Sequence, residues 1–197
     1  GDIVNIVDEV YVQRLTNEDV INLCQRKSWW KDVAPYGAID IAGRGHNAER
    51  SPVEAWYEVA RIRLASEYVY ITDGIDRVHT FLRYDSVRGR PALLVHPRCT
   101  GLIGEMGAGK HPIDSMGTYR YKTDSSGTVV SEKPLDENNH ACSALAYGLV
   151  SRFGLVKRTL GQSKNYSKSP NRPSNYLHTP KGGLDEAIKL LGSRPEP

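Results

Sequence analysis

The sequence predicts an α/β fold, with a mixed central sheet flanked by helices and a basic, flexible C-terminal tail. Short runs rich in β-branched and aromatic residues alternate with amphipathic runs that begin at capping residues. A polar stretch with three prolines follows, from Thr159 to Gly183. With 197 residues, we expect one domain over 1–156, a basic linker over 157–183 and a short helix and end over 184–197.

The composition excludes several classes of protein. Hydrophobic residues make up 39% of the chain and charged residues 25%, which is typical of a globular protein. No run approaches 18 apolar residues, so we expect no transmembrane helix. Cys24, Cys99 and Cys142 are far apart and form no CxxC pair, which argues against a disulfide framework and a structural zinc site and fits a reducing cytosol. Because the chain begins at Gly1 without a signal-peptide pattern, we expect an excised fragment or a processed form of a protein.

The first half of the chain is expected to be rich in strands. The run from Thr16 to Asp19 is the predicted start of a helix, with Val20 to Leu23 following. Alternating residues favour a strand over 53–63, with a helix as the alternative. The other predicted strands are 3–14, 36–43 and 67–73, and those from 36 to 73 would form an antiparallel meander.

The second half is expected to be mostly helical around one buried strand and one hairpin. The clearest helix covers 138–153 and ends before Gly154, because its apolar residues share one face. The hairpin would turn at Asp124 to Gly127. The remaining predictions are helices around 75–82, 98–106 and 184–191 and a strand over 92–95.

Charge is distributed unevenly along the chain. Residues 157–197 carry eight Lys and Arg against three Asp and Glu, whereas 1–156 carry a small net negative charge. A basic tail on a nearly neutral body indicates an anionic partner for the tail. Lys157, Arg158, Lys164 and Lys168 are the tail's candidate DNA contacts, and Arg44 is a further one in the body.

Carboxylates at the ends of predicted strands and helices are the candidate catalytic and metal-binding residues. Asp40 interrupts a short apolar strand, where a charge is costly unless it is paired or binds a metal. Asp73 follows a predicted strand, and it either joins Asp40 at a divalent metal or caps the next helix. Asp136 or Glu137 could supply a third ligand, or could simply complement the dipole of the helix that follows.

The run from Gly104 to Lys110 matches the spacing of a phosphate-binding loop. His111 stands where that motif needs Ser or Thr to hold magnesium, and Pro112 stands where its helix should continue. A flexible glycine-rich loop is therefore the favoured interpretation, and nucleotide binding is the alternative.

Three blocks of the sequence resemble the C-terminal part of phage large terminase subunits, the DNA-packaging motors. The blocks are Pro97 to Glu105, Tyr119 to Lys122 and Asn139 to Tyr147, and the Asp40 strand is similar to the family's first catalytic motif. The resemblance covers about residues 36–153. It implies an RNase H-like nuclease domain in the host cytoplasm that cuts concatemeric double-stranded DNA with two Mg²⁺ or Mn²⁺ ions.

The same resemblance implies catalytic roles for Asp40, Asp73 and Asn139, with Asp40, Asp73 and Glu137 as metal ligands. Its implied partners are double-stranded DNA, the portal protein, the small terminase subunit and an ATPase motor domain, with no membrane. Asn139 and Ser143 depart from the pattern, because the family commonly has aspartate at both positions. The alternative is a catalytically weak or inactive RNase H-like module that binds DNA or docks on the portal.

Overall fold

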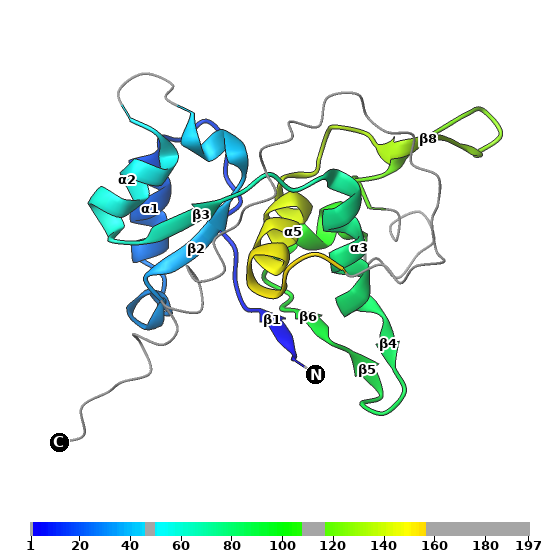
Figure 1. Ribbon diagram of the computed structural model, residues 1–197, viewed down its shortest axis with the longest axis horizontal. Helices are drawn as coiled ribbons and strands as arrows, with labels where there is room; N and C mark the ends of the chain where they lie inside the picture. Colours follow the sequence, from blue (N-terminus) through cyan, green and yellow to red (C-terminus); the bar gives the residue numbers. More distant parts are fainter. Residues whose placement is uncertain (1, 46–49, 108–116, 157–197) are drawn as a thin grey trace. The chain divides into compact units, whose positions relative to one another are not determined.

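The computed structural model describes residues 2–45, 50–107 and 117–156 (Figure 1). These residues belong to one unit, Gly1–Lys157, and a second unit covers Arg158–Pro197. The predicted linker and terminal helix, the four tail cations and part of the Gly104–Lys110 run lie outside the described residues.

The first part of the chain contains a β–α–β unit where a meander was predicted. Its elements are β1 (Val4–Ile6), α1 (Asn17–Gln25), η1 (Trp30–Asp32), β2 (Tyr36–Ile39), η2 (Ile41–Arg44), α2 (Pro52–Ala60) and β3 (Arg63–Ser66). Strands β2 and β3 are parallel, with Tyr36 opposite Arg63, and α2 is the crossover between them. A parallel pair needs such a crossover, whereas a meander joins antiparallel neighbours.

The capping residues explain why residues 52–60 form a helix and not the favoured strand. The Ser51 hydroxyl accepts from the Glu54 N–H, and the Glu54 carboxylate accepts from the Ser51 N–H, which closes a capping box. Pro52 occupies the first helical position, where its missing N–H costs nothing. The same box, between Thr16 and Asp19, confirms the predicted start of α1.

The second part follows the prediction more closely. Its elements are α3 (Ile71–Leu82), β4 (Tyr84–Asp85), β5 (Arg90–Pro91), β6 (Leu93–Val95), α4 (Thr100–Met106), β7 (Tyr121–Thr123), β8 (Val129–Pro134) and α5 (His140–Phe153). Gly154 ends α5 at a φ of 71°, as expected for a glycine stop. The predicted strand over 67–73 is wrong, because β3 ends at Ser66 and α3 begins at Ile71.

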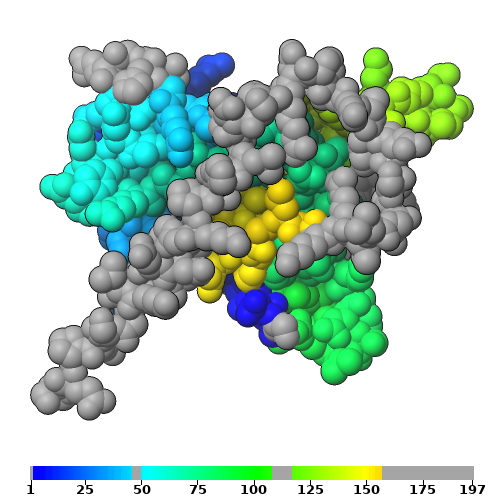
Figure 2. Space-filling model, viewed as in Figure 1, coloured from blue at the N-terminus to red at the C-terminus, as the bar shows by residue number. Residues whose placement is uncertain are grey.

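Mixed α/β structure is confirmed, but a single central sheet is not formed among the described residues. The strands form four two-stranded sheets there: β1–β6 and β2–β3 are parallel, and β4–β5 and β7–β8 are antiparallel. The β7–β8 hairpin projects from the helices and its residues are mostly exposed (Figures 1 and 2).

One hydrophobic core joins the second part of the chain to β1. Helices α3 and α5 pack against each other, and the Phe81 and Phe153 ring centroids lie 4.8 Å apart. The buried residues of this core are Phe81, Leu93, Cys99, Leu102, Leu145 and Leu149. Since α5 also contacts β2, this helix connects the core to the β–α–β unit.

Candidate functional site around Asp40

Asp40 lies at the carboxyl end of β2. Because β2 and β3 are parallel, the segments that follow both strands emerge at the same edge, so Asp40 and Glu67 begin there. Ligands of parallel α/β units bind beyond the carboxyl ends of strands. The fold therefore places Asp40 where a functional carboxylate of this architecture is expected.

Local hydrogen bonds fix the Asp40 backbone and one side-chain oxygen. Its Oδ1 accepts from the Gly43 N–H at 3.1 Å, which caps η2, and its backbone carbonyl accepts from the buried Ser66 hydroxyl at 2.7 Å. Gly43 packs so closely on Ile39 that a Cβ would lie 2.7 Å from that side chain. Within the described residues Oδ2 accepts no hydrogen bond, so one oxygen stays available to a ligand.

Helix α5 contacts β2, and its Tyr147 lines a small cavity with Ala38 and Ile39 at the end of that strand. Burial raises the pKa of Tyr147, and the nearby Asp40 carboxylate raises it further. Ser143 lies one turn before Tyr147 on the same side of the helix, and both line one cavity. Through Tyr147, the α5 segment that carries the terminase-like block also reaches the carboxyl end of β2.

Asn139 directly precedes α5 and is held by its neighbour. Its side-chain amide donates to Asp136 Oδ1 at 3.0 Å, which orients the amide, and its carbonyl accepts from the Ser143 N–H. Glu137 and Asp136 are exposed in the segment before the helix. These contacts account for Asn139 as a structural residue at the start of α5.

Asp73 occupies the first turn of α3 and does not end a strand, which corrects the sequence-based placement. A carboxylate there complements the positive end of the helix dipole. Within 2–45, 50–107 and 117–156, no three His, Cys, Asp or Glu residues come together as a metal-binding group. The predicted ligand set of Asp40, Asp73 and Glu137 is thus not assembled there. Arg44 is exposed at the end of η2, next to the Asp40 edge.

Glu105, which the sequence analysis did not single out, is the most buried carboxylate described. It is 2% exposed and accepts from the Tyr11 hydroxyl at 2.9 Å, the Ala141 N–H at 3.1 Å and the Cys142 N–H at 2.7 Å. Burial and this carboxylate together raise the pKa of Cys142 to about 12, so its thiol stays protonated. The only sequence signal is a lone Glu three residues after Leu102, on the buried face of a short helix.

Glu105 also forms part of the wall of a mostly apolar cavity. The cavity has a volume of about 230 Å³ and lies among α3, α4, α5 and the β7–β8 hairpin. Tyr119, Tyr121 and Tyr147 line it, as does His79. Every buried side-chain oxygen and nitrogen in the described residues has a hydrogen-bond partner, so no orphaned polar group points to a particular ligand there.

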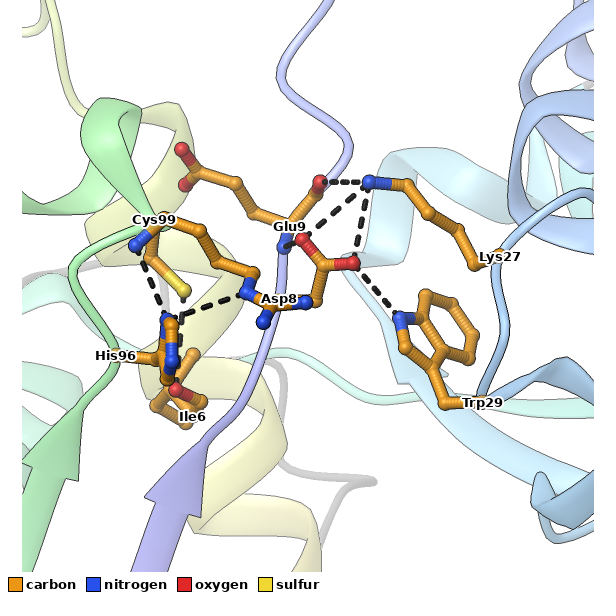
Figure 3. A network of polar contacts seen from close by, with 8 residues as sticks. Ile6, Asp8, Glu9, Lys27, Trp29, His96 and Cys99 are labelled. Atoms are coloured by element: carbon orange, nitrogen blue, oxygen red, sulfur yellow. Dashed lines mark hydrogen bonds and ion pairs between the residues drawn. The ribbon is translucent and has the colours of Figure 1, made fainter.

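A second polar cluster holds the segment after β1 to α1 and η1 (Figure 3). Asp8 accepts from Trp29 Nε1 at 2.9 Å and pairs with Lys27 Nζ at 3.1 Å. The Trp29 hydrogen bond, together with the contacts from Lys27, lowers the pKa of Asp8 from 3.8 to about 2. The folded state therefore favours the ionised form of Asp8.

Asp8→Asn is expected to lower the free energy of unfolding by about 2 kcal/mol at pH 7. Because the folded pKa is below the unfolded one, the contribution is complete above about pH 4 and disappears as the pH falls through about 2. Urea unfolding of both proteins at pH 7 and near pH 2 measures this. A difference that stays constant over that range would show that the ionisation of Asp8 does not stabilise the fold.

No family model matches the chain, and no curated protein or solved structure matches it. Among the residues that the structure describes, no helix is long and apolar enough to cross a membrane.

Proposed function

We propose that the chain is an RNase H-like nuclease domain of a viral large terminase subunit, acting on double-stranded DNA with Asp40 at its active edge. The observation that carries the proposal is the position of Asp40, which directly follows the first strand of a β–α–β unit, the strand that helix α5 contacts. The terminase-like block from Asn139 to Tyr147 spans the start of that helix. The strand that precedes Asp40 and the helix that carries the terminase-like block are far apart in sequence, yet they contact each other.

The element order of the second part supports the same proposal. The block from Pro97 to Glu105 covers the turn before α4 and all of α4 except Met106, and the block from Tyr119 to Lys122 begins the hairpin. Glu105 then connects the first block to the third through the N–H groups of Ala141 and Cys142. The partners that go with this proposal are DNA, the portal protein, the small subunit and the ATPase motor, in the host cytoplasm.

The described donors do not fit a complete two-metal centre. Such a centre holds two ions about 4 Å apart and needs several carboxylates, whereas Asp40 offers one free oxygen and Asn139 an uncharged amide already bonded to Asp136. Mg²⁺ or Mn²⁺ would supply activation of water for phosphodiester hydrolysis. Among these residues, Asp40 would hold such an ion through the carboxylate oxygen that does not cap η2.

The same observation favours a second candidate, an RNase H-like module that binds DNA or docks on the portal without cutting. Such a module would retain Asp40 and the motif in α5, but it would not need an acidic residue at position 139, where Asn139 is bonded to Asp136. DNA binding and DNA cleavage therefore have to be measured separately.

The test incubates the 197-residue chain with supercoiled plasmid and Mg²⁺ or Mn²⁺, with EDTA as control, and measures duplex binding in parallel. The nuclease proposal expects nicked and linear products only with metal. Metal-independent binding with no products, even at high Mn²⁺, selects the binding module. A chain that neither binds nor cuts DNA contradicts the nuclease and the DNA-binding module, and leaves docking on the portal, which binding to isolated portal protein then tests.

A further inference from the structure

An open polar recess of about 590 Å³ lies between the end of α1 and the start of α4. Arg26 and Lys27 line it from the end of α1, and Arg98 lines it from the turn before α4. Asp8 and Glu9, which follow β1, are the carboxylates in its wall. The recess shares no residue with the surroundings of Asp40, so it is a separate feature of the surface.

Both carboxylates of the recess already have partners within the protein. Asp8 pairs with Lys27 and accepts from Trp29, so the charges of Asp8 and Lys27 cancel (Figure 3). The Glu9 carboxylate accepts from the Gly101 N–H at 2.5 Å and the Leu102 N–H at 3.1 Å, at the start of α4. Because these two carboxylates already bind donors of the protein, they do not occupy the guanidinium groups of the recess.

The two arginines retain their donors. Arg98 donates from its backbone N–H and from Nε to His96 Nδ1, both at 3.2 Å, which orients the side chain. Its two terminal NH₂ groups form no ion pair or hydrogen bond with the described part of the chain, and neither does the Arg26 guanidinium. Ser28 and Thr100 add hydroxyls to the same wall. Three cations against two carboxylates leave the recess net positive.

We propose that this recess binds a phosphodiester group of the DNA backbone, with Arg26 and Arg98 as its charged contacts. The inference rests on the proposed function, which makes DNA the ligand. Guanidinium groups bind phosphate oxygens through paired, charge-assisted hydrogen bonds, and hydroxyls add neutral donors. Because contacts to phosphate carry no base information, the recess would position the duplex without selecting its sequence.

The experiment compares duplex binding by the full chain and an Arg26→Ala, Arg98→Ala double variant across a salt series. Arg83→Ala, Arg90→Ala removes the same charge from exposed sites elsewhere in the described structure and serves as the matched control. Loss of two phosphate contacts is expected to reduce the slope of log K against log salt by about two, with affinity at low salt falling on the order of tenfold. Arg98→Lys keeps the positive charge but loses the paired N–H donors of the guanidinium. Combined with Arg26→Ala, it is expected to give a salt slope between those of the wild type and the double Ala variant.

The outcomes separate this inference from the proposed function. A double variant whose slope changes no more than that of the control overturns the recess, even if the wild-type chain still cuts or binds DNA. Calorimetry with inorganic phosphate tests whether the ligand is free phosphate. If the wild type binds phosphate, the double variant does not, and both bind the duplex equally, the assignment to DNA is overturned. If the Arg98 variant unfolds, the single variant Arg26→Ala replaces it, because the Arg26 side chain makes no hydrogen bond with the described residues. Its salt slope is then expected to fall by about one relative to the wild type.

Discussion

Glu105→Ala is expected to destabilise the described domain by about 3 kcal/mol or more, because a buried acceptor disappears while its donors stay. The Tyr11 hydroxyl and the Ala141 and Cys142 N–H groups would lose their partner in a site that is 2% exposed. The last two belong to the first turn of α5, where no intrahelical acceptor can replace Glu105. The substitution therefore loosens the segment after β1, α4 and α5 together.

Thermal and urea unfolding of Glu105→Ala, Glu105→Gln and the wild type measure this effect. A loss of about 3 kcal/mol corresponds to a midpoint lower by roughly 6–12 °C in a chain of this size. Glu105→Gln keeps one acceptor and is expected to cost less than half as much. Glu132→Ala, in the exposed hairpin strand β8, is the control and should leave the midpoint unchanged. Equal midpoints for the Ala variant and the control would show that Glu105 does not hold α5.

Elements with strong local signals could be predicted from the sequence. Thr16 and Asp19 announce α1, Gly154 ends α5, and Asp124 accepts from the N–H groups of Ser126 and Thr128 in the predicted hairpin turn. In each case the deciding contact lies within a few residues along the chain. Local chemistry is sufficient where the competing conformations differ by such a cap or turn.

The secondary-structure predictions are wrong where the deciding contact is long-range, or where the residue pattern fits both the period of a strand and that of a helix. The alternation in residues 53–63 fits a strand, but the capping box at Ser51 and the parallel pairing of β2 with β3 select a helix between them. Residues 67–73 have strand propensity, yet β3 is already paired through Ser66 and the chain then turns into α3. Propensity for strands depends on having a partner, which the local sequence does not contain.

The candidate site shows the same division. Asp40 could be chosen as a candidate from the sequence because an aspartate next to apolar strand residues stands out by itself, and its catalytic role stays a prediction. The positions of Tyr147 and the buried Glu105 could not be foreseen, because they depend on how α5 packs against β2 and α4. The convergence of Asp40 with Asp73 and Glu137 stays a prediction of the resemblance, and the described geometry assembles no such trio.

Asp40→Asn is expected to reduce metal-dependent DNA cleavage by at least about a hundredfold, since loss of a supporting group alone can cost about 10–100-fold. The amide oxygen can still accept from the Gly43 N–H, and the Ser66 contact to the backbone carbonyl is untouched. The fold should therefore survive, with an unfolding free energy within about 1 kcal/mol of the wild type. Only the charge that a metal would require is removed.

Two further variants make the Asp40 measurement decisive. Asp124→Asn removes a carboxylate that also accepts turn N–H groups, but in the exposed hairpin, so cleavage should match the wild type. Asp73→Asn tests the second acid: a loss comparable to that of Asp40→Asn would place both at the reacting phosphate, whereas wild-type cleavage would leave Asp73 as a residue that complements the start of α3. Cleavage rates are compared over a Mn²⁺ titration, with binding of the same duplex measured in EDTA. Full cleavage by Asp40→Asn, with binding and folding intact, would contradict the assignment of the active edge to β2.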